Sequence, residues 1–144
     1  MQLSQPKTPI WYWILSVIAV LWNAGGAWNY VAMRFDIQAV TSQLTPEMVA
    51  YFEAFPLWQE FAWGLAVWTA FAGSILLLVR MKLAALLFLV SIISYIVSSI
   101  YSFGLSNAAE LMGMGGVIFS VVIFLSLLFF FWMARWASSK GILK

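Results

Sequence analysis

The sequence predicts an all-α membrane protein in which four transmembrane helices form an antiparallel bundle, and three observations lead to this fold class. The 144 residues are 65% hydrophobic and only 8% charged, whereas soluble domains carry about 25% charged residues. Four apolar runs reach the roughly 20 residues that a helix needs to cross a bilayer. Residues of opposite charge sort to alternate connections between these runs. We therefore expect residues 1–144 to form a single transmembrane domain.

The four expected spans cover residues 10–33, 57–79, 83–103 and 111–134. Only Arg80-Met81-Lys82 joins the second span to the third, so these two spans must pair as an antiparallel hairpin. The link before the fourth span is also short. No internal repeat relates the two halves of the chain, so the inverted-repeat pattern of many secondary transporters is missing.

The first connection, residues 34–56, is long enough to hold structure of its own. Thr45-Pro46-Glu47 marks a helix start, because threonine is a favoured N-cap, proline suits the first helical position and an acid suits the first turn. We expect residues 46–54 to form a short amphipathic helix on the outer surface, where it can act as a lid. Its apolar side chains should face lipid or the mouth of a pocket: Met48, Phe52 and Phe55.

The charged residues predict the orientation of the protein. Six basic residues flank the start of the chain, the second connection and the end of the chain: Lys7, Arg80, Lys82, Arg135, Lys140 and Lys144. All five acidic residues fall on or beside the first and third connections: Asp36, Glu47, Glu53, Glu60 and Glu110. The positive-inside rule therefore predicts that both termini are cytoplasmic. Arg34 is the one base expected on the outer side.

The composition excludes several classes of chemistry. The chain has no cysteine and no histidine, which rules out disulfide exchange, thiolate catalysis, histidine-ligated haem and the usual zinc sites. A Ser-His-Asp triad is impossible for the same reason. We expect no metal and no cofactor, and an enzyme is the least favoured class. The basic residues lie beside spans, so topology explains them and nucleic acid is not an expected partner.

Each span carries a stripe of small or polar residues of the kind that packs helices together in lipid. In the second span, Ala62, Ala66 and Ala70 lie on one face of the helix, nearly opposite Glu60 and Gly64. We expect only one of these two faces to point into the bundle. The sequence leaves open which one it is.

Polar residues concentrate in the outer half of the expected bundle, while the inner half is almost entirely aliphatic and phenylalanine. This distribution predicts a polar and aromatic pocket that opens outward over a sealed hydrophobic base. The candidate pocket residues are Asn23, Tyr30, Arg34, Glu60, Trp63, Tyr95, Tyr101 and Glu110. Aromatic walls with a few polar groups suit a small amphipathic ligand, such as a lipid-like molecule, a quinone or a sugar with an apolar face.

Several of these residues also have a purely structural interpretation. Glu110 follows Asn107 by three positions, which matches a capping box at a helix start. Glu60 follows Pro56 by about one turn and suits the first turn of a helix. Asn23 lies near the middle of its span, where an unpaired amide is costly, so we expect a hydrogen bond to a neighbouring helix, for instance to a serine of the third span.

Arg34 should form an ion pair, because a guanidinium without an anion in this setting costs several kcal/mol. Glu60 and Glu110 are the carboxylates that can reach it from neighbouring helix starts, and Asp36, only two residues away, is a local competitor. Glu110 is the preferred partner, because Gly113 on the same side of its helix lets two backbones approach closely.

The segments "FPLWQEFAWGLAVWTAFAGSILLLVR" and "LWNAGGAWNY" resemble a group of small four-helix bacterial membrane proteins near the DoxX-like proteins, which are often labelled "sugar transporter". The resemblance rests on Phe55-Pro56-x-Trp58, on the run from Trp63 to Gly73, and on Ser106-Asn107. It implies a bacterial inner-membrane location and association with membrane oxidoreductases. Similar folds in sterol-related families imply a lipophilic ligand in a pocket with acidic residues.

Three functional hypotheses remain open at this point. The leading one is a protein that binds a small amphipathic or lipophilic ligand in the outward pocket. The second is a small transporter that works as a homo-oligomer, for a sugar or a related solute. The third is a structural or accessory subunit of a membrane complex, whose small-residue stripes meet the helices of a partner. In all three, the lipid bilayer is the common partner.

Overall fold

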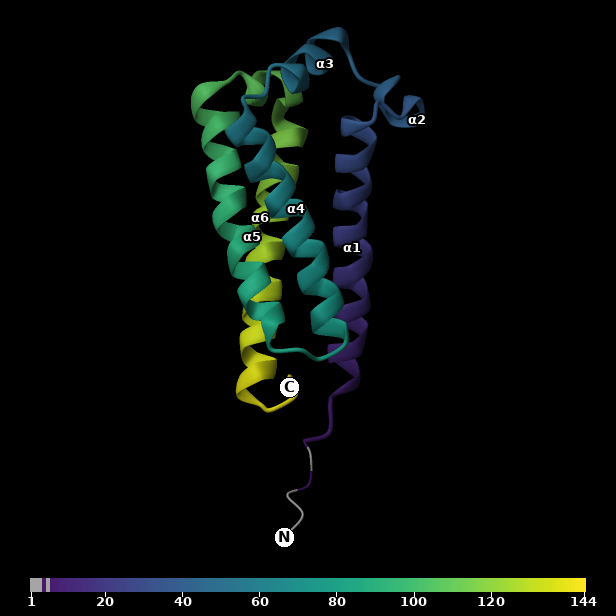
Figure 1. Cartoon of the computed structure of the whole chain (residues 1–144), viewed down its shortest axis with the longest axis vertical. Coiled ribbons are helices and arrows are strands. Elements are labelled where there is room, and N and C mark those ends of the chain that lie inside the picture. Colours follow the sequence, from purple (N-terminus) through teal and green to yellow (C-terminus); the bar gives the residue numbers. More distant parts are fainter. Residues whose placement is uncertain (1–3, 5) are drawn as a thin grey trace.

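The computed structural model describes residue 4 and residues 6–144, and every regular element in this part of the chain is helical (Figure 1). Four long helices are α1 (Ile10–Arg34), α4 (Leu57–Leu78), α5 (Leu83–Ser99) and α6 (Ala108–Ser139). Two short helices, α2 (Gln38–Thr41) and α3 (Pro46–Glu53), lie between α1 and α4. A π-helical turn, η1 (Ile100–Leu105), continues α5.

Four helical segments are long and apolar enough to cross a membrane, which confirms the four expected spans: Ile10–Arg34, Leu57–Leu78, Leu83–Leu105 and Ala108–Ser139. The last differs most from the expected range of 111–134, because α6 begins three residues earlier and ends five residues later. Ala134 and Ala137 are fully buried, so packing continues where hydropathy falls. Gly141, with φ of 69°, lies just beyond the end of the helix.

The short helix α3 confirms that the first connection holds a helix beginning at Pro46, and it covers all but the last residue of the predicted range 46–54. The hydroxyl oxygen of Thr45 accepts a hydrogen bond from the backbone N–H of Met48 at 3.3 Å, and Pro46 occupies the first turn. The helix α2 was not predicted. It follows a turn in which Asp36 has φ of 48°, and Thr41 donates its hydroxyl to the Asp36 carboxylate at 2.6 Å.

The charges separate along the long axis of the molecule. The α4–α5 connection, the start of α1 and the end of α6 lie together at one end, which we call the basic end (Figure 1). The helices α2 and α3 and the connection from η1 to α6 lie at the other, the acidic end (Figure 1). The sorting by sign that was found in the sequence is therefore a sorting in space.

The basic end is tightly packed. Its buried core includes Tyr12, Leu77, Phe88 and Met133, which come from all four long helices and are each fully buried. The segment after α6 closes this core, because Ile142 and Leu143 are buried too. Backbone hydrogen bonds pair this segment with the α4–α5 connection, from the Lys144 N–H to the Arg80 carbonyl at 2.8 Å and from the Lys82 N–H to the Lys144 carbonyl at 2.9 Å.

Helix α4 packs on two sides, against α1 and against α5. On the α1 side, a Cβ added to Gly64 would lie 2.9 Å from the Tyr30 hydroxyl oxygen, so an alanine there would force the Tyr30 side chain to shift. On the α5 side, Ser91 donates a hydrogen bond to the Ala66 carbonyl at 2.7 Å. The expectation that only one face of the second span packs against other helices is therefore wrong, since α4 lies between two neighbours.

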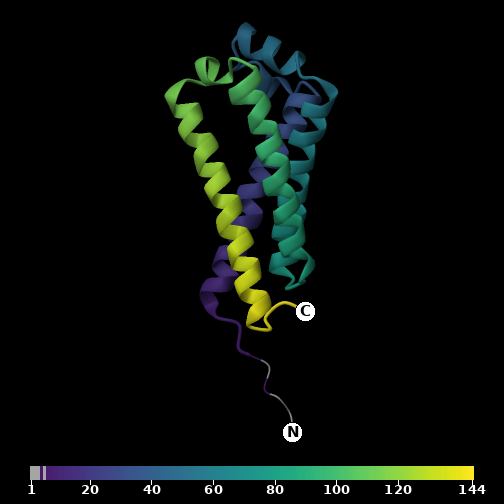
Figure 2. The ribbon, with the colours of Figure 1, turned by 90° about the vertical axis from the view of Figure 1, so that its left-hand side faces the viewer.

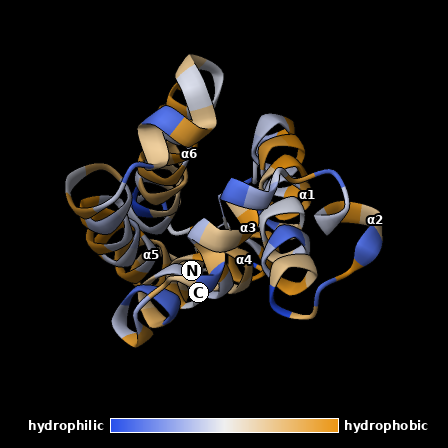
Figure 3. Ribbon diagram, turned by 90° about the horizontal axis from the view of Figure 1, so that it is seen from above, coloured by the Kyte–Doolittle hydropathy of each residue, from blue (hydrophilic) through white to orange (hydrophobic). Residues whose placement is uncertain are grey.

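Helix α6 packs mainly against α5 and leans away from it toward the acidic end (Figure 2). Seen along the long axis, α6 lies beside α5 and α1 lies beside α4, and α3 lies over the space between them (Figure 3). Because α6 leans away from α5 at the acidic end, its residues there lie farther from the other helices.

Candidate functional site

Two cavities adjoin in the acidic half of the molecule. The first, of about 390 Å³, lies at the acidic end and is lined by the end of α1, by residues of α2 and α3, and by the first turns of α4. We call it the acidic-end pocket. The second, of about 560 Å³, is lined by residues of all four long helices and is called the central cavity. Trp63 of α4 lines both of them.

The acidic-end pocket contains an ion pair between Arg34, the last residue of α1, and Glu60, in the first turn of α4. The Arg34 Nη1 and Glu60 Oε1 atoms are 2.5 Å apart. The side chains are 47% and 29% exposed, respectively, so the pair is only partly desolvated. This confirms that Arg34 pairs with a carboxylate from a neighbouring helix start.

The preferred partner, Glu110, was wrong. Glu110 is exposed on the first turn of α6, and α6 leans away from α5 at this end (Figure 2). The close approach expected near Gly113 does not occur, because a Cβ added to that glycine would meet nothing within 4 Å. The capping box is also absent, since the Asn107 side chain makes no cap hydrogen bond.

Three aromatic side chains form one wall of the acidic-end pocket: Phe52, Phe55 and Trp63. Their ring centroids lie 5.4 Å apart for Phe52–Phe55, 5.8 Å for Phe52–Trp63 and 5.9 Å for Phe55–Trp63. We call this group the aromatic triad. It forms because α3 ends just before Pro56, and the chain then turns into α4, which places the end of one helix against the second turn of the next.

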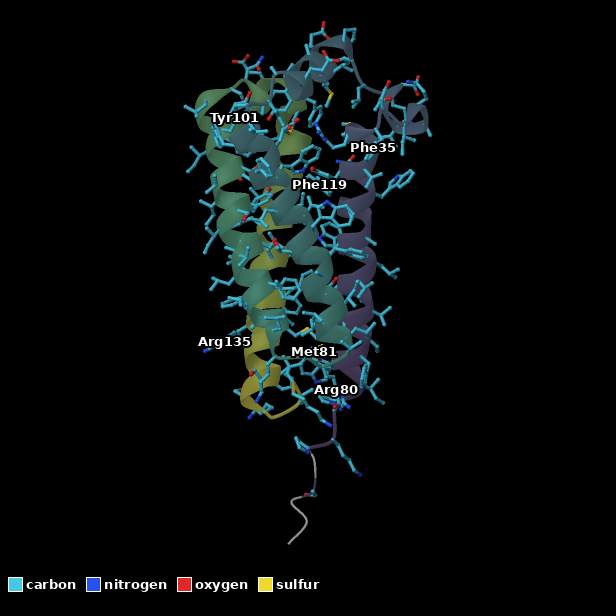
Figure 4. The ribbon with its side chains drawn as sticks, in the orientation of Figure 1. Phe35, Arg80, Met81, Tyr101, Phe119 and Arg135 are labelled. Carbon is cyan, nitrogen blue, oxygen red and sulfur yellow. The ribbon has the colours of Figure 1, made fainter. Side chains whose placement is uncertain are left out.

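The central cavity has mostly apolar walls with a few polar side chains. Asn23 lines it and is 7% exposed. Its side-chain amide donates to the Ala19 carbonyl at 2.9 Å, one turn earlier in the same helix. The expected hydrogen bond from Asn23 to a neighbouring helix is therefore wrong. Phe119 of α6 lies in the space between α1 and the other long helices (Figure 4) and lines the same cavity.

Trp22 and Tyr95 tie α6 to its neighbours around the central cavity. The Trp22 indole N–H donates to the Ser126 hydroxyl at 3.1 Å, across from α1 to α6. The Tyr95 hydroxyl donates to the Ser120 carbonyl at 2.8 Å, across from α5 to α6. Since both side chains also line the cavity, the hydrogen bonds that hold α6 also shape the space between the helices.

The remaining candidates lie around these cavities. Tyr30 packs on Trp63 with ring centroids 4.8 Å apart and lines a groove between α1, α4 and α5. Tyr101 of η1 lies at the acidic end (Figure 4), lines neither cavity and packs against Phe55 with ring centroids 5.4 Å apart. Arg34, Glu60 and Trp63 thus meet at the acidic-end pocket, and Asn23, Trp63 and Tyr95 at the central cavity. Glu110 lines neither.

Gln59 was missed by the sequence reasoning. Its side chain is 1% exposed and donates an amide hydrogen to the Ser98 hydroxyl at 2.9 Å. Within the described residues, the Gln59 side-chain oxygen has no hydrogen-bond partner. Its position beside Glu60, at the start of an apolar run, was the one feature of the sequence that could have indicated a buried polar contact. Asp36 and Glu53, which line the acidic-end pocket, were also left out of the expected site.

Neither cavity carries a metal centre that the structure can identify. Across residue 4 and residues 6–144, no three Asp, Glu, His or Cys side chains lie close enough together to hold a metal ion. No protein-family model, curated protein or solved structure matches the chain. The geometry of the two cavities is therefore the basis for inferring the function.

Proposed function

We propose that the protein binds one small amphipathic ligand, with the polar part in the acidic-end pocket and the apolar part in the central cavity. The observation that carries this proposal is the place of Trp63, which lines both cavities. A charged and aromatic pocket thus adjoins a mainly apolar one. Each cavity has a volume in the range of about 300–1,000 Å³ that small-molecule sites occupy.

The groove between α1, α4 and α5 is a weaker candidate for the apolar part of the ligand. It shares Arg34 and Glu60 with the acidic-end pocket and has a volume of about 680 Å³. Its walls include Leu57, Phe61 and Leu65, which are 69%, 70% and 50% exposed. Side chains exposed to that degree on a spanning helix face lipid, so acyl chains of the bilayer compete for this groove. The central cavity is open to lipid only on one side, where Leu21 and Phe119 are 68% and 55% exposed. Its other walls include the buried residues Asn23, Ala66, Ala70 and Ser91.

We propose the following placement in the membrane. The four long helices form an antiparallel bundle in the bacterial inner membrane, with the basic end and both termini cytoplasmic and the acidic end outward. The bacterial location rests on the resemblance to the DoxX-like group, which stays a prediction. In this orientation the acidic-end pocket faces the outer surface, and the central cavity lies at the depth of the outer leaflet.

The tight packing of the basic end favours a binding protein over a transporter. A transport path through a single chain would have to open the core around Tyr12, Phe88 and Met133, which is fully buried, and displace Ile142 and Leu143. An oligomeric transporter for a sugar or a related solute would need its path between chains. Helix α6 favours the accessory-subunit alternative. Only 22% of its most apolar stretch is buried within the protein, against 39% for the corresponding stretch of α4.

Native mass spectrometry of the protein purified in mild detergent tests the proposed function. We expect a bound molecule of defined mass on the monomer of the wild-type protein and of Trp132→Ala, which removes a 54% exposed tryptophan of α6. Trp63→Ala should lose it, because this variant removes the wall that the two cavities share. A thermal unfolding scan checks that both variants fold. Equal occupancy in the two variants contradicts the proposal.

A further inference from the structure

We propose that the polar part of the ligand is a cation, an amine or quaternary ammonium group, held by the aromatic triad together with Glu53 and Glu60. This inference rests on the proposed function and names the chemical class of ligand for the same site. It follows from three features of the acidic-end pocket: its charge balance, the position of Glu53 in its helix, and the arrangement of its aromatic rings.

The acidic-end pocket is lined by three carboxylates, those of Asp36, Glu53 and Glu60, and by one guanidinium, that of Arg34. Asp36 already accepts hydrogen bonds from Thr41 at 2.6 Å and from Gln38 at 3.2 Å. Within the described residues, the one ion pair joins Arg34 to Glu60, so Glu53 has no cationic partner. The excess of negative charge attracts a cationic head group and repels an anionic one.

Glu53 is the last residue of α3. The unpaired carbonyl groups at a helix C-terminus carry partial negative charge, so a carboxylate is disfavoured there and a cation is favoured. Glu53 therefore adds to the negative potential of the pocket instead of neutralising it. A bound cation would offset the repulsion between the Glu53 carboxylate and the helix C-terminus. The pocket therefore favours a positively charged ligand.

The three rings of the aromatic triad line the acidic-end pocket, and aromatic rings attract cations through their quadrupole. The one cation–π contact in the described part of the chain is at the basic end, where Arg80 lies 5.7 Å from the centroid of the Trp13 ring. Arg34 is thus paired with Glu60 and does not lie over Phe52, Phe55 or Trp63. Aromatic rings combined with carboxylates are the arrangement by which proteins recognise quaternary ammonium groups.

Arg34 acts in this account as a competing internal cation. Its side chain is 47% exposed, so it can move away from Glu60 when a ligand enters. The sign of its effect distinguishes ligand classes. Removing Arg34 should strengthen the binding of a cation and weaken the binding of an anion, by roughly three- to tenfold for a unit charge several ångströms away in a half-exposed site.

The test uses the full chain in nanodiscs of zwitterionic lipid and three probes with the same tail: decyltrimethylammonium, decyl glucoside and decyl sulfate. Binding is measured by calorimetric titration below micellar concentrations, with the heat of empty nanodiscs subtracted. We expect the ammonium probe to bind most tightly and the sulfate probe most weakly. Arg34→Met should strengthen the binding of the ammonium probe, while Glu53→Gln and Glu60→Gln should each weaken it, by roughly three- to tenfold.

Glu110→Gln is the matched control, because Glu110 is an exposed carboxylate on α6 that lines neither cavity. It should leave the binding of all three probes unchanged. Glu53 is exposed as well, so Glu53→Gln keeps the test valid even where Glu60→Gln impairs folding.

Two outcomes overturn the inference and are distinguishable. Tighter binding of the glucoside or the sulfate, or weaker ammonium binding by Arg34→Met, contradicts a cationic ligand while the proposed function stands. Failure of every probe to bind saturably to the wild-type protein contradicts both the inference and the proposed function.

Discussion

The Nη1 atom of Arg34 lies 2.5 Å from the Oε1 atom of Glu60, which joins the end of α1 to the first turn of α4. Both side chains line the acidic-end pocket, and Trp63, one turn further along α4, connects that pocket to the central cavity. This ion pair therefore lies where helix packing and ligand binding meet, and it has consequences for stability as well as for binding.

The ion pair should contribute little to stability. Because its side chains are 47% and 29% exposed, we expect a coupling energy of about 0.5–1 kcal/mol in a double-mutant cycle with Arg34→Met and Glu60→Gln. Denaturant unfolding of the four proteins in detergent measures it. A coupling energy above about 3 kcal/mol would show instead that the pair is fully desolvated.

Gly64→Ala should destabilise the packing of α4 on α1 by about 1 kcal/mol. The new Cβ would lie 2.9 Å from the Tyr30 hydroxyl oxygen, and Tyr30 is held in place by Trp63 and Trp68, with centroids 4.8 and 6.1 Å away. Tyr30→Phe in the Gly64→Ala background should recover part of the loss, as measured by thermal unfolding. A stabilised Gly64→Ala protein would contradict this close approach.

Tyr12→Phe should destabilise the basic end by about 0.5–1.5 kcal/mol, because it removes the hydrogen bond to the Leu77 carbonyl, which still accepts one from the Arg80 N–H at 3.1 Å. The Tyr12 hydroxyl lies 2.5 Å from the Leu77 carbonyl oxygen, and the Tyr12 side chain is fully buried. Tyr101→Phe is the control, since the hydroxyl of Tyr101 makes only a 3.4 Å contact in an exposed place. Equal stability of the two variants would mean that the basic end is hydrated.

The absence of cysteine allows a clean test of the membrane orientation. Single cysteines at Ser42, Met81 and Lys140, all of them exposed positions, can be labelled with a membrane-impermeant maleimide in intact cells. We expect Ser42→Cys to react from outside, and Met81→Cys and Lys140→Cys to react only after lysis. Labelling of Lys140→Cys in intact cells would contradict the proposed orientation.

Much of the fold could be predicted from the sequence, because its strongest signals are local. Hydropathy alone located the four long helices, and Thr45-Pro46-Glu47 located α3. The partner of Arg34 could not be chosen correctly, because the choice between Glu60 and Glu110 depends on how far α6 leans from its neighbours. That lean is set by contacts distant in sequence, such as Trp22–Ser126, for which a single sequence holds no local pattern.

The candidate site was predicted less completely than the fold. Arg34, Glu60 and Trp63 were predicted as pocket residues from their residue types and their expected depth in the membrane. The structure places all three in one pocket. Two further features depend on where a side chain points and were missed. Asn23 makes its hydrogen bond within its own helix, and Gln59 is buried between α4 and α5.

Gly26→Leu tests the central claim, that the central cavity holds the apolar part of a ligand. Gly26 lines that cavity, and a Cβ added to it would meet nothing within 4 Å. Leucine is also a better helix former than glycine by roughly 0.5–1 kcal/mol, so the variant should fold at least as stably as the wild-type protein. The decisive measurement is native mass spectrometry of both proteins purified side by side. We predict a bound small molecule on the wild-type protein and none on Gly26→Leu, and equal occupancy of the two would contradict the account.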